Sequence, residues 1–374
     1  MLGNKRILKI LRYIKIYGFS RTLVKALGRL RSKVPIWLIL SFPKYFRRGK
    51  KVGLIGCGQH SFSSVAYYLT KLTNCKLIWV GDIDQAASST LAFAYRSKDV
   101  GYDCEDTSKV EKPDIVYIIS NHSSHTDYAI KYLKLGCEIY IEKPISVSKE
   151  QLVELEKSVA DSTSNIYVGY NRPHSAAIGL IKESIENYHA PFTLSCFVIG
   201  HFLPDDHWYR DPGEGTRIIS NLAHWIDLSI HMFSWMQNIP EYIDIHVAYS
   251  DKENTSENIS MTMTSPRGDL INLIFSCRNE PFEGVNETIN YQQDNLAVKI
   301  DDFRDIQIWK NDTYRRVRFR PKDNGHKAAV LQPFNTSDIR PWNEIIESTK
   351  LVLHIEEMVK SLAKESRYYF SKLK

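Results

Sequence analysis

The chain has 374 residues, of which 43% are hydrophobic and 25% charged. These proportions are those of an ordinary globular protein, and the length allows two domains that each bury a core of their own. The net charge of +6 is concentrated at one end, because residues 1–51 contain fifteen Lys or Arg and the first acidic residue is Asp82. The rest of the chain has 34 basic and 43 acidic residues, so the basic excess is a local feature. Six scattered cysteines without a C-x-x-C pair argue against a disulfide framework or a zinc knuckle and favour a reducing compartment.

Residues 1–50 are predicted to form a basic helical arm. Apolar residues recur at helical spacing over residues 7–16, and Ser20 is placed to cap a second helix. That second helix would contain Leu23, Val24, Leu27 and Leu30. Residues 47–51 are interpreted as a basic linker. The apolar run 36–40 is too short to cross a bilayer, which needs about 20 apolar residues, and no secretory signal is recognisable.

The arm allows three interpretations. Its helices would either pack on the body of the protein with a basic solvated face, or form an amphipathic anchor for an anionic membrane surface or an acidic partner. A mitochondrial transit peptide, which is also rich in arginine and free of acidic residues, is the third.

Strands alternate with helices after residue 51, which predicts a parallel, doubly wound sheet over residues 51–170. The predicted strands are 52–55, 76–80, 114–119 and 138–141. From about residue 190 strand-like runs follow one another without helices, so residues 171–340 are predicted to form an α+β domain with a large, mostly antiparallel sheet. Its predicted strands are 192–199, 242–249, 259–264, 270–277 and 295–308, with a turn at 265–269. A helix within residues 341–374 closes the chain.

A glycine-rich loop joins the first strand of the parallel sheet to a helix. Residues 56–61 read Gly-Cys-Gly-Gln-His-Ser, in which Gly56 permits a tight turn and Gly58 lets the backbone approach a pyrophosphate. The third motif position is Ser61 rather than Gly or Ala. Asp82 ends the next strand, where a carboxylate accepts hydrogen bonds from both ribose hydroxyls and repels a 2′-phosphate. The pattern predicts a Rossmann domain that binds NAD in preference to NADP.

Two further groups carry chemistry. Glu142-Lys143-Pro144 follows a strand at the carboxyl edge of the sheet, where Lys143 can donate to a carbonyl or alcohol oxygen during hydride transfer. His224 lies in a helical stretch of the second domain, three residues before Asp227 and on the same helix face. Histidine is suited to taking the proton of a substrate hydroxyl.

In these motifs the chain resembles the glucose–fructose oxidoreductase, inositol dehydrogenase and MocA-like family, and the likeness covers about residues 51–360. The likeness extends to Asn121-His122-Ser123-Ser124-His125, Gly169-Tyr170-Asn171-Arg172, Gly325-His326-Lys327 and Trp342-Asn343-Glu344. The arm is similar to segments that precede this domain in bacterial surface-polysaccharide oxidoreductases.

The resemblance implies a role for each matching residue. Lys143 corresponds to the family's catalytic lysine, with a cis bond to Pro144, and His224 to its general acid or base. The residues expected to bind the cofactor are Gly56, Gly58, Gln59, His60, Ser61, Asp82, Asn121, His122, His125, Glu142 and Lys143. Those expected near the substrate are Tyr170, Asn171, Arg172, Trp208, Arg210, Ser220, Asn221 and Asp227.

The chain departs from the family next to His224. Many members have Asp four residues earlier and others Glu three earlier, where this chain has Ser220 and Asn221. Neither supplies a negative charge to orient an imidazole, so Asp227 either takes that role or is structural. His60, His122 and His125 lack a nearby Cys or carboxylate to complete a metal site, so no metal is expected. The polar and aromatic residues 201–210 form either a solvated loop or a sugar-contacting lid.

Taken together, the sequence predicts an NAD-dependent oxidoreductase that transfers a hydride to or from a hydroxyl-bearing carbon of a sugar or sugar nucleotide, in surface polysaccharide biosynthesis. The alternatives are an NAD-binding sensor or scaffold with weak catalysis and a redox-neutral, NAD-using lyase or glycosidase. We expect a cytoplasmic homo-oligomer without a nucleic-acid ligand, peripheral at the inner membrane face if residues 1–50 bind there. Removing residues 1–48 is expected to abolish membrane association and leave NAD binding intact.

Overall fold

The computed structural model describes residues 2–36, 49–278, 284–335, 339–371 and 373. They form two compact units, Met1–Gly169 with His326–Ile339 and Tyr170–Gly325 with Arg340–Lys374. Residues 37–40 of the apolar run 36–40 and residues 47–48 of the basic linker 47–51 lie outside the described residues. All six cysteines are buried, and none of them forms a disulfide.

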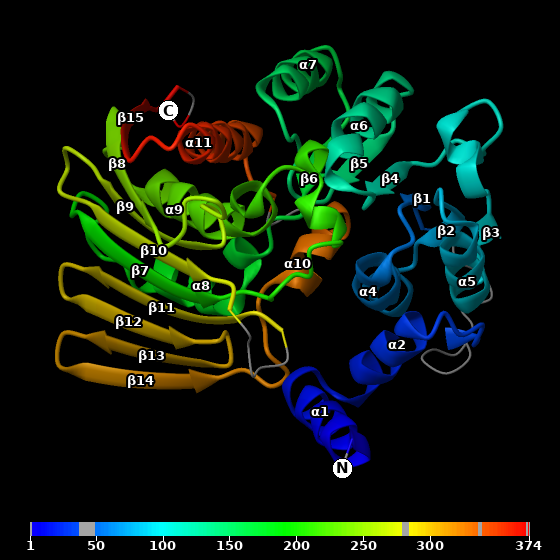
Figure 1. Cartoon of the computed structure of the whole chain (residues 1–374), viewed down its shortest axis with the longest axis horizontal. Helices are drawn as coiled ribbons and strands as arrows, with labels where there is room; N and C mark the ends of the chain where they lie inside the picture. The colour runs from blue at the N-terminus through cyan, green and yellow to red at the C-terminus, as the bar shows by residue number, and fades with distance from the viewer. Residues whose placement is uncertain (1, 37–48, 279–283, 336–338, 372, 374) are drawn as a thin grey trace. The chain divides into compact units, whose positions relative to one another are not determined.

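A parallel sheet forms the centre of the first unit (Figure 1). Its six described strands have the order β3-β2-β1-β4-β5-β6, and every pair is parallel. The strands are β1 Lys51–Ile55, β2 Lys76–Gly81, β3 Lys98–Asp99, β4 Ile115–Ile118, β5 Glu138–Ile141 and β6 Ile166–Val168. The order reverses at β1, as in a doubly wound sheet, so the predicted Rossmann fold is confirmed.

Helices cover both faces of this sheet, α4 and α5 on one side and α6 and α7 on the other (Figure 1). They are α4 Ala66–Leu72, α5 Gln85–Tyr95, α6 His125–Lys134 and α7 Lys149–Ala160. Asp84 begins α5 as its N-cap, accepting hydrogen bonds from the backbone N–H groups of Ala86 and Ala87. Every strand except the short β3 is fully buried over most of its length, which explains the continuous apolar runs in the sequence.

The prediction that residues 326–340 belong to the second domain is wrong for residues 326–339. Helix α10 (His326–Leu331) packs against α4 in the first unit. The Tyr117 hydroxyl donates to the Val330 carbonyl at 2.7 Å, and Gln332 Nε2 donates to the Val168 carbonyl at 2.9 Å. These bonds join residues more than 150 positions apart, and local sequence patterns carry no signal for such pairing.

The arm forms the two expected helices, α1 Leu2–Tyr17 and α2 Phe19–Arg29. The N-cap of α2 is Gly18 and not Ser20. The Ser20 hydroxyl is instead hydrogen-bonded to the hydroxyl of Tyr67 at 2.8 Å. Val24 is buried in the core of the first unit. Helix α2 is therefore an integral part of this unit, as the packing interpretation predicts.

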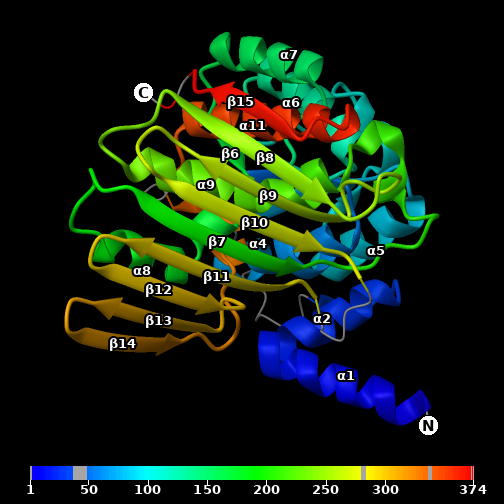
Figure 2. The same ribbon diagram turned by 60° about the vertical axis from the view of Figure 1, so that its left-hand side comes forward.

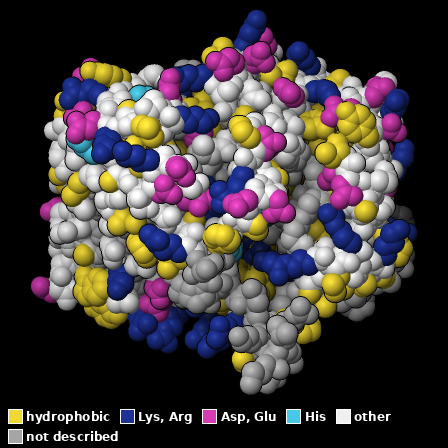
Figure 3. All heavy atoms as spheres, in the orientation of Figure 1, with side chains coloured by type: hydrophobic (Ala, Val, Ile, Leu, Met, Phe, Trp, Pro, Cys, Tyr) yellow, Lys and Arg dark blue, Asp and Glu magenta, His cyan; other side chains and the backbone are white. Residues whose placement is uncertain are grey.

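Helix α1 keeps large apolar side chains on the surface, since Leu8, Ile10 and Leu11 are all exposed. In the region that α2 occupies, dark blue basic and yellow hydrophobic side chains lie next to each other (Figure 3). No helix among the described residues is long and apolar enough to cross a membrane.

The second unit is built on a large sheet whose described strands have the order β14-β13-β12-β11-β7-β10-β9-β8-β15. The strands are β7 Phe192–Ile199, β8 Tyr242–Tyr249, β9 Asn258–Thr264, β10 Leu270–Ser276, β11 Asn286–Gln293, β12 Leu296–Asp301, β13 Asp305–Lys310, β14 Thr313–Arg318 and β15 Glu365–Tyr369. Of these pairs only β7 and β10 are parallel, which confirms a mostly antiparallel sheet.

Two features of this sheet differ from the sequence analysis. The single strand expected over residues 295–308 is broken at Asp302 and Phe303, which both have positive φ and turn the chain between β12 and β13. The chain also does not end in a helix, because β15 pairs with β8 after the final helix. Its sequence, Glu-Ser-Arg-Tyr-Tyr, is too short and polar to predict a strand.

The helices of the second unit lie on one face of the sheet (Figure 2). They are α8 Ala176–Ser184, α9 Ala223–Trp235 and α11 Trp342–Lys360. Burial alternates along the strands, as in β9 and β10, because only side chains on the helix-covered face are in the core.

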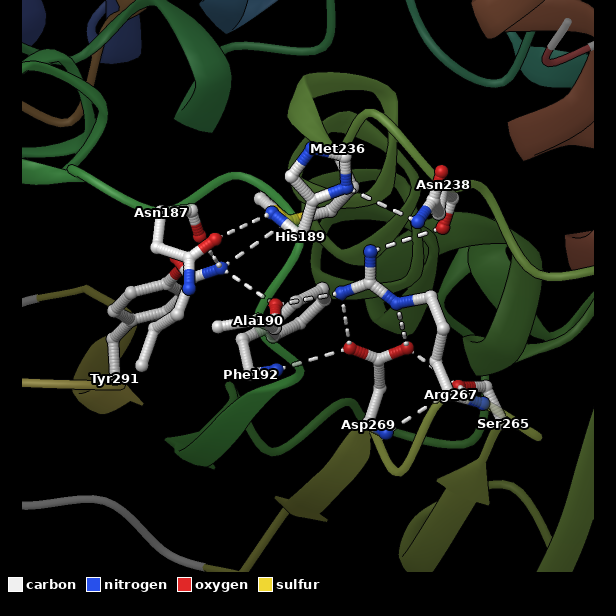
Figure 4. A network of polar contacts seen from close by, with 11 residues as sticks. Asn187, His189, Ala190, Phe192, Met236, Asn238, Ser265, Arg267, Asp269 and Tyr291 are labelled. Atoms are coloured by element: carbon white, nitrogen blue, oxygen red, sulfur yellow. Dashed lines mark hydrogen bonds and ion pairs between the residues drawn. The ribbon is translucent and has the colours of Figure 1, made fainter.

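A buried polar cluster fixes one end of this sheet at the predicted turn between β9 and β10 (Figure 4). Arg267 and Asp269 form an ion pair at 2.9 Å, and the side chain of Asp269 is fully buried. Asp269 accepts a hydrogen bond from the Phe192 N–H at 3.0 Å, and Arg267 donates to the Ala190 carbonyl at 2.9 Å. The cluster therefore joins the start of β7 to the start of its parallel neighbour β10.

Candidate functional site

The predicted glycine loop connects β1 to the helical segment that contains residues 61–72. Gly56 has a φ of 88°, and a Cβ at this position would lie 2.3 Å from the Ile119 carbonyl oxygen. Only glycine fits there. A Cβ at Gly58 would have no described heavy atom within 4 Å, so the backbone of the loop is open to a ligand at that point.

Asp82 lies at the end of β2 and is attached to the glycine loop. One carboxylate oxygen accepts from the Cys57 N–H at 2.5 Å and the other from the Asp84 N–H at 2.8 Å. The Ser61 hydroxyl donates to the Gly56 carbonyl. This hydrogen bond stabilises the turn, so the serine at the third motif position has a structural role.

Residues 61–65 form a π-helical turn, η1, before α4. Such turns widen a helix locally and are frequent at functional sites. The Gln59 side chain, expected at the cofactor, donates to the Lys25 carbonyl of α2 at 3.1 Å, so it links the loop to the arm.

Glu142 occupies a buried position directly after β5 and joins the glycine loop to the next segment of the site. Its carboxylate lies 3.2 Å from His60 Nε2 and accepts from the Tyr140 hydroxyl at 3.0 Å. Burial acts to raise the pKa of Glu142, but His60 and Lys143 favour the carboxylate and bring the pKa below its usual value. A Cβ at Gly169 would lie 2.6 Å from this carboxyl group, which explains a glycine at that position.

The peptide bond between Lys143 and Pro144 is cis, as the family resemblance implied. His125 holds this turn in place. Its Nδ1 lies 2.7 Å from the Pro144 carbonyl and its Nε2 lies 3.1 Å from the Ser120 carbonyl. Burial lowers the pKa of His125, although both carbonyls act in the opposite direction. His125 is therefore a buried clamp between two loops of the site.

Asn121 and His122 follow β4 in a short 3₁₀ turn, η3, of residues His122–Ser124. The Asn121 side chain is exposed and accepts from the Ser124 hydroxyl at 3.0 Å, whereas His122 is buried. Within the described ranges no group of three or more His, Cys, Asp or Glu side chains is arranged to hold a metal ion.

These residues share one edge of the first unit. Gly56, Asp82, Asn121 and Lys143 follow β1, β2, β4 and β5, which are adjacent and parallel. The carboxyl ends of such strands are where ligands bind in open α/β sheets. The cofactor-binding residues expected from the sequence are thus brought together at one edge.

The second unit contains His224 in the first turn of α9. A second π-helical turn, η7 (Ile218–Leu222), precedes it and contains Ser220 and Asn221. The Ser220 hydroxyl donates to Asn221 Oδ1 at 3.1 Å. The Tyr170 ring packs edge-on against His224 with 6.2 Å between centroids, which places the first residue of this unit at the predicted catalytic imidazole.

Asp227 is committed to an ion pair in the interior. Its two oxygens accept from Arg340 at 2.8 and 3.0 Å, and Arg340 also pairs with Glu344, which lies 2.8 Å from His231 Nδ1. Burial raises the pKa of Asp227 and outweighs the opposing effect of Arg340. This bidentate pairing supports a structural role for Asp227 rather than the orientation of His224, the two alternatives that the sequence left open.

Asn171 and Arg172 are also buried, and their polar groups bond within the second unit. Asn171 Nδ2 donates to the Asn324 carbonyl at 2.5 Å. Arg172 forms an ion pair with Glu287 at 3.2 Å and lies over the Trp225 ring, 4.6 Å from its centroid. These contacts fix the start of the unit and α9.

The predicted loop 201–210 ends in a short 3₁₀ turn, η5 (Trp208–Arg210). Trp208 is 45% exposed, and its ring packs edge-on against Tyr209. Arg210 forms an ion pair with Glu257 at 2.7 Å and donates to the Leu203 carbonyl at 2.9 Å. Arg210 thus anchors the loop, while Trp208 presents an aromatic surface.

Comparison with known proteins agrees with this geometry. Residues 50–170 match the model of the Gfo/Idh/MocA oxidoreductase family, described as having an NAD-binding Rossmann fold. Residues 50–170 therefore form a domain of the Gfo/Idh/MocA type.

Curated relatives of the chain include the inositol 2-dehydrogenase of Ralstonia nicotianae, 24% identical over 212 residues that make up 54% of this chain and 58% of the relative. The inositol 2-dehydrogenase/D-chiro-inositol 3-dehydrogenase of Lacticaseibacillus casei is 25% identical over 235 residues, 60% of this chain and 65% of the relative. The chain therefore spans less than two thirds of the length of either relative.

Solved structures share the fold. The UDP-N-acetylglucosamine 3-dehydrogenase GnnA of Acidithiobacillus ferrooxidans is similar with a TM-score of 0.66 and 17% identity, covering 84% of this chain and 99% of that one. GenD2 from gentamicin A biosynthesis, solved in complex with NAD, gives a TM-score of 0.66 at 14% identity and covers 86% of this chain and 96% of that one.

Three residues at this site were given no role by the sequence analysis. Tyr140 holds Glu142, and Gly169 makes room for it. The His326 ring lies 5.5 Å from the His60 ring. The Gly325-His326-Lys327 motif was noticed, but nothing in its spacing indicated that His326 returns to the glycine loop.

Proposed function

We propose that this protein is an NAD-dependent dehydrogenase acting on a hydroxyl-bearing carbon of a cyclic polyol or sugar. The observation that carries the proposal is the cradle of the first unit, in which the open backbone at Gly58 and the carboxylate of Asp82 share an edge with Lys143. A pyrophosphate needs an unobstructed backbone, and a ribose diol needs a carboxylate acceptor. The residues present therefore fit NAD.

When bound, NAD supplies a hydride acceptor at its nicotinamide ring. Lys143 would donate to the substrate oxygen and stabilise the negative charge that develops on it. His224 would take the hydroxyl proton as the carbonyl forms, and return it in the reverse direction. Glu142, whose lowered pKa keeps it charged, would hold His60 and the Lys143 segment in place.

The test measures nicotinamide reduction by the purified full chain with NAD and a panel of inositols, free sugars and UDP-sugars. Lys143→Ala and His224→Asn should each reduce kcat by about 100-fold or more, with the affinity for NAD of His224→Asn unchanged. Lys149→Ala removes the same charge from an exposed position nearby and should keep wild-type activity. Full activity of Lys143→Ala would contradict the mechanism.

An NAD-binding sensor or scaffold is the second candidate. It is supported by Ser220 and Asn221 in place of a carboxylate and by the pairing of Asp227 with Arg340. This candidate predicts tight NAD binding without turnover of any polyol or sugar in the same panel.

The substrate class rests on the named relatives, which include inositol dehydrogenases and a UDP-sugar dehydrogenase. We propose a polyol or sugar, and a sugar nucleotide of surface polysaccharide biosynthesis as its narrower form. A rate with UDP-sugars well above that with free inositols would support the narrower form.

The arm and the outer face of the large sheet bear on location and assembly. Helix α1 has no acidic residues and exposes Leu8, Ile10 and Leu11, which fits an anionic membrane surface. We propose a cytoplasmic protein that is peripheral at such a surface.

The sheet face opposite the helices exposes Phe197 and Leu270, and we propose this face as a homo-oligomer interface. Liposome flotation of Leu8→Asp/Leu11→Asp and the solution mass of Phe197→Asp test the two proposals.

A further inference from the structure

The arm reaches the ribose end of the cofactor cradle through Arg31. Arg31 follows α2 and ends it in a left-handed conformation, with a φ of 48°. This conformation is uncommon for residues other than glycine. The Arg31 guanidinium lies 3.3 Å from the carboxylate of Asp84.

Asp84 belongs to the same edge as Asp82. The Asp84 N–H donates to the Asp82 carboxylate at 2.8 Å, and Asp82 in turn holds the Cys57 N–H of the glycine loop. Burial and Asp82 raise the pKa of Cys57, whereas Arg31 acts to lower it. The guanidinium of Arg31 is therefore close enough to the glycine loop to act electrostatically on Cys57.

Helix α2 is held on this loop by several contacts, so the position of Arg31 is not accidental. Gln59 Nε2 donates to the Lys25 carbonyl at 3.1 Å, and Arg21 donates to the Ser64 hydroxyl at 3.1 Å. A Cβ at Gly28 would lie 2.6 Å from the Phe62 ring, which shows how closely the helix approaches η1.

We propose that Arg31 is a cofactor-specificity residue supplied by the arm, placed to receive the 2′-phosphate of NADP in exchange for Asp84. Asp82 alone would restrict the cradle to NAD, because it repels a 2′-phosphate. Arg31 brings a guanidinium, the side chain best suited to bind phosphate with two parallel hydrogen bonds. The domain would then accept both dinucleotides.

The exchange is feasible because the Arg31–Asp84 pair is on the surface. The two side chains are 44% and 52% exposed, and exposed pairs contribute little to stability. Asp84 also loses nothing as a helix cap, since its other oxygen accepts from Ala86 and Ala87. The inference rests on the proposed binding of dinucleotides to this cradle.

The experiment measures equilibrium binding of NAD and NADP to the full chain by calorimetry. Arg31→Ala should raise the Kd for NADP by about tenfold or more and that for NAD by less than about threefold. Asp84→Asn keeps a good helix cap and frees Arg31, so it should tighten NADP binding. Arg29→Ala removes the same charge from an exposed position of α2 and should leave both affinities unchanged.

The outcomes separate this inference from the proposed function. Wild-type protein that binds NAD but not NADP, or Arg31→Ala that changes both affinities equally, overturns the specificity role alone. Weakening of NADP binding by Asp84→Asn would mean that the ion pair only holds the arm in place, and it also overturns the role. Absence of NAD binding by the wild type overturns the cradle and the inference together.

Discussion

The α-carbon of Gly169 faces the carboxyl group of Glu142 so closely that a methyl group on it would lie 2.6 Å from that group. Gly169 ends the first of the two segments that make up the first unit, and Glu142 follows β5. The space left by the missing side chain thus allows a buried carboxylate to contact Tyr140 and His60.

Gly169→Ala should therefore displace the Glu142 carboxylate. We expect destabilisation of about 1–3 kcal/mol from overpacking and a weaker affinity for NAD, because His60 loses its partner beside the glycine loop. Chemical denaturation and NAD titration measure the two effects. Gly179→Ala lies in α8 where a Cβ meets no described atom within 4 Å, and it should be neutral or stabilising by up to about 1 kcal/mol. Equal behaviour of the two variants would contradict the packing argument.

Ser61→Ala should loosen the glycine loop. The buried Ser61 hydroxyl donates to the Gly56 carbonyl, and loss of such a hydrogen bond costs about 1 kcal/mol. We expect a lower melting temperature and a Kd for NAD raised by about two- to fivefold. Ser89→Ala, at a half-buried position of α5 where the hydroxyl bonds only to the Ala86 carbonyl of the same helix, is the control and should change neither quantity.

Asp269→Ala should destabilise the second unit strongly. It leaves Arg267, whose side chain is only 12% exposed, without its buried partner and removes the acceptor for the Phe192 N–H. Breaking a buried pair from one side costs about 3–5 kcal/mol. Asp244→Ala breaks the half-exposed pair with Arg367 and should cost less than about 1 kcal/mol. Urea denaturation compares them, and a loss below about 1 kcal/mol for Asp269→Ala would refute the anchoring part of the cluster.

His125 should make stability depend on pH. Its pKa in the folded protein is lowered by burial, so the folded state favours neutral imidazole. The stabilisation is fully present above the unfolded pKa of about 6.5 and is lost as the pH falls through the folded value. His125→Gln should therefore show a shallower fall in melting temperature below pH of about 6.5 than the wild type. His246→Gln, an exposed histidine, should keep the wild-type slope, and a slope unchanged in His125→Gln would exclude this contribution.

The parts of the fold and site that local patterns determine could be predicted from the sequence. Gly56, Gly58 and Asp82 are fixed by the strand, turn and helix around them, and the edge shared by Asp82 and Lys143 follows from a parallel sheet. The alternation of strands and helices was enough to predict the parallel sheet, and strand-like runs without intervening helices predicted the mostly antiparallel one.

What escaped prediction depends on contacts between distant residues. The pairing of Asp227 with Arg340 joins positions 113 apart, and the return of His326 to His60 spans still more of the chain. The π-helical turns at 61–65 and 218–222 were also not predicted. The place of α2 over the glycine loop depends on Gly28 meeting Phe62, which composition does not reveal.

Strand β15 protects one edge of the large sheet. With β15 in place, β8 has a partner on both sides in the large sheet. A shortened chain ending before residue 365 would uncover the backbone N–H and C=O groups of β8 along that side, and such a bare margin invites pairing between molecules and aggregation. With β15 paired, the edge of the sheet is instead a five-residue strand that contains Glu365 and Arg367, and a short, charged edge is less prone to such pairing.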